Sequence, residues 1–487
     1  MLFNSLPFIY FFVIVVILYF VTPFRLRWVL LLGASYYFYL CWKAEYLLII
    51  LLSTLISYYI GIKLGKVKVQ STRKRILILA LAYHIGMLFL FKYFDFFNDN
   101  LKTLFNTLNL FYGVPAFNFL QPIGISFYTF KSISYCIDVY RGDLKPERHL
   151  EKLALYIAFF PQLLAGPIER ATRLIPQFYQ RVNFDDQRVT DGLRLMIWGF
   201  FEKMVIADNL AILVDSVYNH PTHYQGIGLT LATLFYSFQI YCDFSGYSDI
   251  AIGAAQIMGY QTMDNFNRPY FSSSIGDFWR NWHISLSTWL RDYLYIPLGG
   301  NRVSRPRWYF NLMVVFLLCG LWHGANWTFI LWGGIHGFYL IFSNLTKKIR
   351  EGIIQKTGLN HPPGFYRAIK VVTTFVLVSF AWIFFRANSV SDSLYIISHL
   401  FSGWEKEFSI DGLRNMVFWK EGRFEFIIGS ASIVFLIVVQ IFQRNGRIYH
   451  LLSSKPIGLR WSFYYFILLA ILLCGNFGTK QFIYFQF

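Results

Sequence analysis

The sequence predicts an all-α polytopic membrane protein, and three observations carry that prediction. Of its 487 residues, 56% are hydrophobic and only 14% are charged, whereas a soluble domain has about 25% charged residues. Apolar runs long enough to enter or cross a bilayer recur along the whole chain. Lys and Arg gather in the short segments between these runs, and the 21% aromatic content suits the Trp and Tyr belts of membrane interfaces.

The apolar runs give the expected helices in order. They cover residues 6–24, 28–42, 46–62, 76–92, 119–139, 152–167, 189–214, 226–258, 308–322, 326–345, 367–387, 424–443 and 459–476. A crossing needs about 20 residues, and some runs are short or contain Gly, Pro or charge, so we expect about 11 true crossings with the others re-entrant or interfacial. No basic segment precedes the first run and no small-residue cleavage site follows it, which favours a retained first helix over a signal peptide.

Charge placement predicts the orientation. Arg25 and Arg27 lie between the first two runs, and a basic cluster at 63–75 lies between the third and fourth. Because basic loops stay in the cytoplasm, we expect an extracytoplasmic N-terminus.

Two more polar stretches interrupt the apolar pattern. Residues 92–118 predict an extracytoplasmic loop or interfacial helix, and residues 389–423 predict an amphipathic surface helix. We expect one integral-membrane domain over 1–487, with N-terminal helices in 1–92, a core at about 119–345 and C-terminal helices in 367–487. The absence of an internal repeat disfavours an inverted-repeat transporter.

Composition excludes two other classes. The formal net charge of +18 would suit a nucleic-acid binder, but no groove-binding motif accompanies it. The five cysteines form no Cys-x-x-Cys pair, so neither a zinc site nor a disulfide framework is indicated.

The segment 278–302 is rich in Trp, His and Arg, which is unusual for a membrane helix. If it is helical, Trp279, His283 and Ser287 share one face at spacing i, i+4, i+8, and Arg280, Arg291 and Arg302 bring positive charge to the same region. A surface helix with Trp anchors and solvated Arg is the competing interpretation.

Residues 320–327 read Gly-Leu-Trp-His-Gly-Ala-Asn-Trp between two apolar stretches. An ionisable group at membrane depth is costly and usually faces a polar cavity or partner, and His suits general-base work near neutral pH. The glycines would allow close approach of backbone or substrate. His323 is therefore a catalytic candidate, against the alternative of a buried His bonded to a backbone carbonyl.

Other polar positions are weaker candidates. On one continuous helix His336 would lie about 140° around from His323, so the two could not easily share a metal, and no metal motif appears elsewhere. The stretch 241–249 carries two carboxylates that could pair with an Arg or line a tunnel. Lys131 and Asp138 are seven residues apart and could share a helical face; for these groups a structural role is favoured. The candidate tunnel-lining residues are Asp243, Ser245, Asp249 and Asn326.

Taken together and in this order, the motifs resemble those of the membrane-bound O-acyltransferase family, in the bacterial branch that contains the alginate O-acetyltransferase membrane subunit. The motifs that carry the resemblance are Gln121–Phe127, Phe160–Ile168, Tyr241–Asp249, Phe278–Arg302, Leu321–Asn326 and the terminal Phe482–Phe487. The resemblance implies a helical bundle around a central funnel through the membrane, with a histidine at its narrow centre. It places the invariant histidine of the family on His323, and it puts His283 where many relatives have a second polar residue, often Asn.

The resemblance also implies a mechanism. A cytoplasmic acyl thioester, acetyl-CoA in this branch, would be the donor substrate, with no bound cofactor and no metal. His323 would act as general base on an acceptor hydroxyl, a transient acyl-His being the alternative, and His283 would position a reacting group or donate to the oxyanion. We infer that Arg280, Arg291 and Arg302 could hold donor phosphates; contact with lipid headgroups is the competing interpretation.

By resemblance, the chain would sit in the bacterial inner membrane and pass an acetyl group toward an extracytoplasmic, SGNH-like acetyltransferase partner that modifies an exopolysaccharide such as alginate, or a cell-wall glycan. D-alanyl transfer to teichoic acid is the second substrate hypothesis. A transporter or flippase of an acylated carrier, and a membrane scaffold without chemistry, are hypotheses from other classes.

Overall fold

The structure is a computed structural model, and it describes residues 1–117, 122–164, 166–358, 361–404, 422–445, 455–477 and 482–483. Every regular element assigned within these ranges is a helix, as the sequence predicts. The chain forms two compact units, one made of Met1–Leu193 and Ala251–Met263 and the other of Arg194–Ile250 and Asp264–Phe487. The expectation of one domain with its core at about 119–345 stays a prediction.

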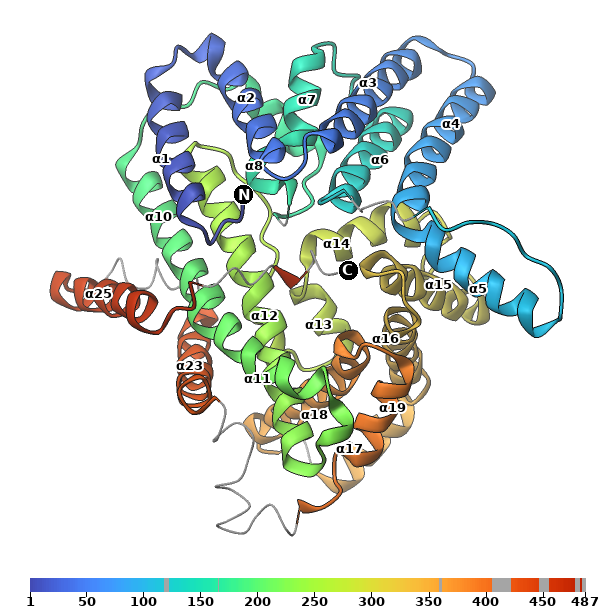
Figure 1. Cartoon of the computed structure of the whole chain (residues 1–487), viewed down its shortest axis with the longest axis vertical. Coiled ribbons are helices and arrows are strands. Elements are labelled where there is room, and N and C mark those ends of the chain that lie inside the picture. Colours follow the sequence, from blue (N-terminus) through green and yellow to red (C-terminus); the bar gives the residue numbers. More distant parts are fainter. Residues whose placement is uncertain are drawn as a thin grey trace. The chain divides into compact units, whose positions relative to one another are not determined.

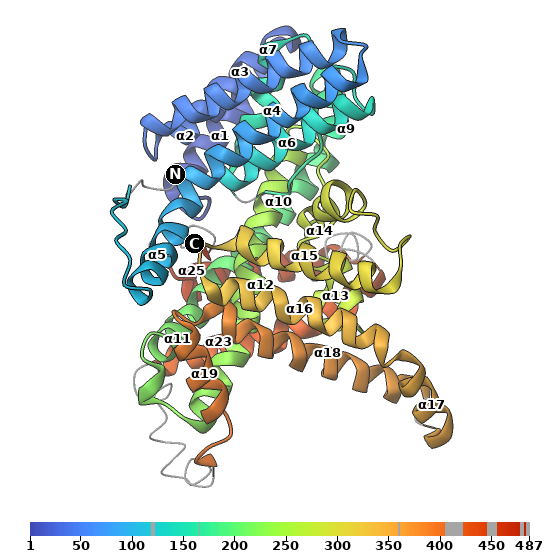
Figure 2. The ribbon, with the colours of Figure 1, turned by 90° about the vertical axis from the view of Figure 1, so that its right-hand side faces the viewer.

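The first unit is built from the N-terminal helices. They are α1 (Leu6–Val21), η1 (Phe24–Leu26), α2 (Arg27–Leu40), α3 (Glu45–Lys66), α4 (Gln70–Leu88), η2 (Phe89–Tyr93), α5 (Phe94–Thr107), α6 (Ile125–Arg141), α7 (Leu150–Ala158), α8 (Phe160–Leu163), α9 (Ala171–Leu174), η3 (Ile175–Tyr179) and the start of α10 (Asp186–Phe200). Figures 1 and 2 show α3, α4 and α6 lying side by side. The run 152–167 is broken at Phe159, because α7 ends at Ala158 and a new short helix begins at Phe160 with Pro161 in its first turn.

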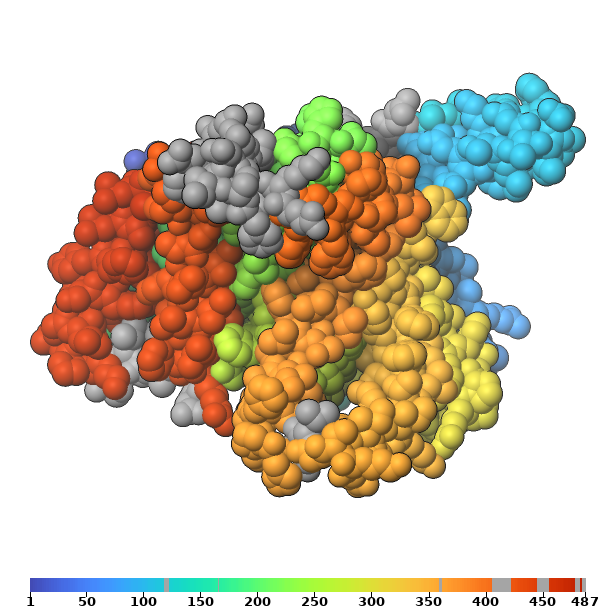
Figure 3. Space-filling model, turned by 90° about the horizontal axis from the view of Figure 1, so that it is seen from below, coloured from blue at the N-terminus to red at the C-terminus, as the bar shows by residue number. Residues whose placement is uncertain are grey.

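The second unit holds the later helices. They are the end of α10, η4 (Phe201–Ala207), α11 (Asp208–Tyr218), η5 (Pro221–His223), α12 (Gly226–Ile257), η6 (Pro269–Phe271), α13 (Ile275–Asn281), α14 (Ile284–Leu290), η7 (Arg291–Tyr295), α15 (Arg305–His323), α16 (Trp327–Leu345), α17 (Lys347–Thr357), α18 (Pro363–Arg386), α19 (Val390–His399), α23 (Arg423–Phe442), η8 (Gln443–Asn445) and α25 (Ile457–Cys474). Seen from below, the face formed by α16, α17 and α18 is hollowed (Figure 3).

α15 and α16 form an antiparallel hairpin whose backbones touch. A Cβ added at Gly320 would overlap the carbonyl oxygen of Phe329, and one added at Gly333 would overlap that of Phe316. Small residues are the usual means of bringing membrane helices this close. The close approach fixes where the last turn of α15 ends, and therefore where His323 lies.

Six described helices are long and apolar enough to cross a membrane: Glu45–Lys66, Gln70–Thr107, Trp327–Leu345, Pro363–Arg386, Arg423–Phe442 and Ile457–Cys474. The protein is thus a multi-helix membrane protein, while the number of about 11 crossings and the extracytoplasmic N-terminus stay predictions. Several other apolar runs form helices that are shorter, such as α1 with 16 residues, or that are interrupted, as the run 189–214 is by the π-helical segment η4.

The polar stretches are only partly described. Residues 92–118 contain the helix α5, and residues 389–423 contain α19. Residues 405–421 of that second stretch lie outside the described residues, as do Gln121, Ala165 and residues 484–487 of the sequence motifs.

Candidate active site

His323 is the last residue of α15. The helix ends there because Gly324 adopts an extended conformation, with φ −162° and ψ 151°, and Asn326 begins the next helix as the N-cap of α16. The side chain of Asn326 accepts a hydrogen bond of 3.0 Å from the backbone N–H of Thr328, which satisfies one of the free donors at that helix start. His323 is buried at this corner, with 2% of its surface exposed.

His283 lies at a second break, between α13 and α14. Its backbone is left-handed, with φ 42° and ψ 56°, a conformation that non-glycine residues adopt at a cost. Trp279, His283 and Ser287 therefore do not share one helical face, because the segment is not one continuous helix: it ends at Asn281 and restarts at Ile284.

Asn265 explains this break. Its carbonyl accepts a hydrogen bond of 2.9 Å from the N–H of Ile284, and its side-chain oxygen accepts one of 2.8 Å from the Ser285 hydroxyl. Asn265 in turn donates to the Ser248 hydroxyl of α12 at 2.9 Å. The start of α14 is thus bonded to a loop instead of to the preceding turn, and His283 is turned out of the helical path.

The two breaks bring His283 and His323 together. Their ring centroids are 6.4 Å apart at an interplanar angle of 53°. Phe244 packs edge-on against His283 at 4.5 Å, and Trp332 and Phe385 pack against His323 at 5.1 and 5.2 Å. The pair is therefore enclosed by aromatic rings, where electrostatic interactions are stronger than in water.

His336 occupies a separate position. It belongs to α16, and α15 has already ended at His323, so the angle of about 140° expected on one continuous helix does not apply. Its Nδ1 accepts a hydrogen bond of 3.2 Å from Trp279 Nε1. Within the described part of the chain, no three His, Cys, Asp or Glu side chains are grouped so as to hold a metal ion.

Two of the three candidate donor-binding arginines share a cavity. Arg280 and Arg291 line a space of about 380 Å³ bounded by α13, α14, η7 and α15, together with Trp279 and Ile284. Arg280 also pairs with Asp277 at 3.2 Å, and Arg291 with Asp292 at 2.7 Å. Arg302 is exposed after η7 and is not among the lining residues of that cavity.

Ser245 and Asp249 line a second cavity of about 350 Å³, which has a polar wall that includes Glu202 and Arg268. Ile284, the residue after His283, borders both cavities. Sequence reasoning did not single out Glu202, although a carboxylate inside the apolar run 189–214 was a usable signal.

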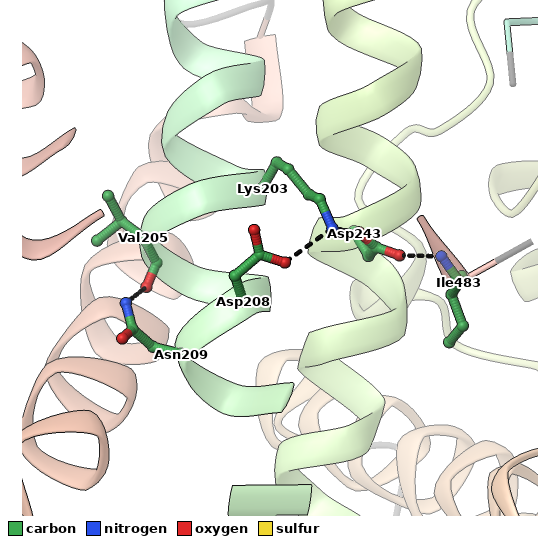
Figure 4. A network of polar contacts seen from close by, with 6 residues as sticks. All are labelled: Lys203, Val205, Asp208, Asn209, Asp243 and Ile483. Atoms are coloured by element: carbon green, nitrogen blue, oxygen red, sulfur yellow. Dashed lines mark hydrogen bonds and ion pairs between the residues drawn. The ribbon is translucent and has the colours of Figure 1, made fainter. Parts of the chain in front are cut away.

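Asp243 has a different environment (Figure 4). Its carboxylate accepts from Lys203 Nζ at 2.5 Å and from the N–H of Ile483 at 2.8 Å, and Lys203 also pairs with Asp208 at 2.7 Å. The sequence suggested an Arg as a possible ion-pair partner of Asp243, and the partner is instead Lys203. Asp243 was also a candidate tunnel-lining residue, and it is not among the residues that line the 350 Å³ cavity. A Cβ at Gly246 would crowd the backbone N of Lys203, so this glycine permits the close approach that the ion pair needs.

The Asp243 carboxylate also holds Ile483, and with it Phe482, near the ring that packs on His283. Phe482 stacks on Tyr247 with ring centroids 4.4 Å apart and lies 5.7 Å from Phe244, and Phe244 is the ring against His283.

In the first unit, Lys131 donates to Gln162 at 3.1 Å and lies over the Tyr156 ring. These contacts describe a structural role for Asp243 and Lys131.

An apolar helical fold with a buried histidine pair defines an integral-membrane protein with a candidate acid–base site. The sequence profile of the membrane-bound O-acyltransferase family matches residues 149–389. Over 409 residues the chain is 42% identical to the probable alginate O-acetylase AlgI of Pseudomonas aeruginosa. The aligned region covers 82% of this chain and 75% of that relative. It is 36% identical to the peptidoglycan O-acetyltransferase of Helicobacter pylori over 398 residues, 75% of this chain and 72% of the relative.

A more distant relative is the teichoic acid D-alanyltransferase of Bacillus subtilis, 33% identical over 247 residues, 48% of this chain and 62% of the relative. The chain belongs to the membrane-bound O-acyltransferase family and is an O-acyltransferase, as the motifs predict.

Proposed function

We propose that the protein transfers an acetyl group from acetyl-CoA in the cytoplasm toward an extracytoplasmic polysaccharide, with His323 as the catalytic base. The observation that carries this proposal is the buried pair of His283 and His323, whose ring centroids are 6.4 Å apart. The names of the relatives, an alginate O-acetylase and a peptidoglycan O-acetyltransferase, support acetyl as the group and a polysaccharide as the final acceptor.

His323 removes the proton of the acceptor hydroxyl as that oxygen attacks the thioester carbonyl. The C–O bond forms, the C–S bond breaks, and the proton passes from His323 to the departing CoA thiolate. Burial lowers the pKa of His283 below its ordinary value, so its ring is neutral and one nitrogen carries a proton. That N–H is the donor to the oxygen on which negative charge develops.

The cavity that contains Arg280 and Arg291 supports a donor site. Its lining is otherwise mainly apolar, with Trp279 at its wall, and guanidinium groups bind phosphate oxygens in pairs. The 350 Å³ cavity, with Ser245 and Asp249 in its wall, is suited to hydroxyl-bearing acceptor groups. Ile284, next to His283 in the chain, borders both cavities, while neither His283 nor His323 is among their described lining residues. Donor and acceptor would therefore extend beyond these two cavities to reach the histidine pair.

The proposed location is the bacterial cell membrane, which is the inner membrane in bacteria that have two membranes. The proposed partner is an extracytoplasmic SGNH-like enzyme. In cells, His323→Ala is expected to leave the protein inserted and to abolish acetylation of the surface polymer, while His84→Ala, a buried histidine of α4, retains it. Full acetylation by the His323 variant would refute the role of this residue.

D-alanyl transfer to teichoic acid is the alternative that the Bacillus subtilis relative supports. Mass analysis of surface polymers from a deletion strain distinguishes the two, since either acetyl esters or D-alanyl esters disappear. Purified protein in liposomes with labelled acetyl-CoA tests the transporter hypothesis, because a flippase would release no CoA.

A further inference from the structure

A groove between α16, α17 and α18 lies outside the site described above. Its volume is about 590 Å³, within the range of ligand pockets, and Figure 3 shows it as the hollow enclosed by these three helices. Its walls are mainly apolar, with Phe338 and Phe342 from α16, Ile353 from α17, and Ile369 and Leu377 from α18.

The charged groups of the α16–α18 groove are all of one sign. Of the described residues that line it, Arg350 and Lys370 are cationic and none is acidic. Arg350 is held in place from α16, because its guanidinium donates to the carbonyl and to the hydroxyl of Ser343 at 2.6 and 3.1 Å. Lys370 lies with its ammonium 5.3 Å from the centre of the Tyr366 ring, so both cations are fixed beside the apolar walls.

A second apolar groove provides a comparison. The space of about 400 Å³ between η4, α23 and α25 is lined by residues such as Val205, Phe435 and Leu469, with no charged residue among those described. The α16–α18 groove differs because it combines apolar walls with two cations.

We propose that the α16–α18 groove binds an anionic phospholipid. The acyl chains lie along the aromatic and aliphatic walls, and the phosphate is bound by Arg350 and Lys370 through charge-assisted hydrogen bonds. Basic pockets between membrane helices commonly take such headgroups. α17 fits this arrangement, because its Ile349 and Ile353 are 65% and 51% exposed next to Lys347 and Lys348, as in a helix lying at a membrane interface.

The bound lipid would also support the active site. Ser273, Ser274 and Ile275 form part of the groove. Ser274 is the N-cap and Ile275 the first residue of α13, which carries Trp279 and ends at Asn281, two residues before His283. Tyr339 lines the same groove and its ring centroid is 5.9 Å from that of His336. Anionic lipid in the groove therefore stabilises the helix that leads to His283.

The test uses the full chain purified in detergent, with binding of phosphatidylglycerol and of phosphatidylcholine of the same acyl chains measured by native mass spectrometry and by the shift in Tm. We expect phosphatidylglycerol to raise Tm more than phosphatidylcholine. The double variant Arg350→Gln, Lys370→Gln is expected to lose at least about tenfold in affinity for phosphatidylglycerol, since the charge-assisted hydrogen bonds of both cations to the phosphate are lost. Lys356→Gln is the matched control, because Lys356 is exposed on α17 but does not line the groove.

A second variant tests the apolar walls. Thr373→Trp places an indole in the groove and is expected to weaken binding of both lipids. Equal binding of the two lipids by the wild-type protein, or an unchanged preference in the Arg350 and Lys370 double variant, would overturn the proposal. Inorganic phosphate alone raising Tm as much as phosphatidylglycerol would identify a simple anion site and also overturn it. His323→Ala should keep the lipid preference, so a failure of the proposed chemistry would be seen separately.

Discussion

The imidazole rings of His283 and His323 lie with their centroids 6.4 Å apart, although the two residues belong to different breaks between helices. His283 occupies a left-handed turn before α14, and His323 is the last residue of α15. A group that bridges two buried imidazoles can lose a proton to one and accept a hydrogen bond from the other.

The role of His283 as a donor to the oxyanion predicts a graded series. His283→Ala should lower kcat by about 10²-fold with little change in KM, because the lost interaction exists only in the transition state. His283→Asn, which keeps an N–H donor, should recover part of the loss. Steady-state kinetics of acetyl-CoA consumption by purified variants measures both, and equal loss in the two variants would argue against hydrogen-bond donation.

The donor cavity predicts an effect on KM. Arg280→Gln combined with Arg291→Gln should raise KM for acetyl-CoA by about tenfold or more with a smaller change in kcat, since the interaction with phosphate is made before and during the reaction. Arg302→Gln is the comparison, because Arg302 does not line the cavity. An equal rise in KM from Arg302→Gln would place the donor phosphates outside this cavity.

Asn265 is expected to position His283. Asn265→Ala removes the side-chain bonds to Ser285 and Ser248 and should relax the turn at His283, lowering kcat by about 10²-fold, as displacements of about 1 Å can. Asn311→Ala is the matched control, since Asn311 is also buried and bonds to the carbonyls of Leu298 and Gly300. If the Asn265 variant kept full kcat, the turn would not depend on this residue.

Asp243 is expected to contribute to stability. Asp243→Asn replaces one of the two carboxylate partners of the buried Lys203 by a neutral amide. Because this weakens a charge-assisted hydrogen bond, it should reduce the free energy of unfolding by about 1.5–3 kcal/mol. Asp215→Asn should cost at most about 1 kcal/mol, because its pair with Arg386 is partly exposed. Thermal unfolding of the two variants in one detergent makes the comparison, and equal losses would contradict the importance of the buried network.

The helices were largely predictable because their signal is local. Apolar runs such as 46–62 and 367–387 became α3 and α18, since a segment without water must satisfy its own backbone groups as a helix. His323 was also predictable as a candidate, from its glycine neighbours and from the order of the motifs. The break at Phe159 also had a local signal, Pro161. The break at His283 had none, because it depends on Asn265 and stands in a segment whose composition is helical.

What the sequence by itself determined is the all-helical membrane class, the family, and the two histidines as candidates. Only the tertiary structure decided that His283 leaves the helix, that Asp243 pairs with Lys203, and that Arg280 and Arg291 share a cavity while Arg302 does not line it. The physical reason is that these outcomes depend on partners distant in the chain. Asn265 bonds the start of α14, and Gly246 lets Lys203 approach Asp243, whereas hydropathy and spacing report only on neighbours along the sequence.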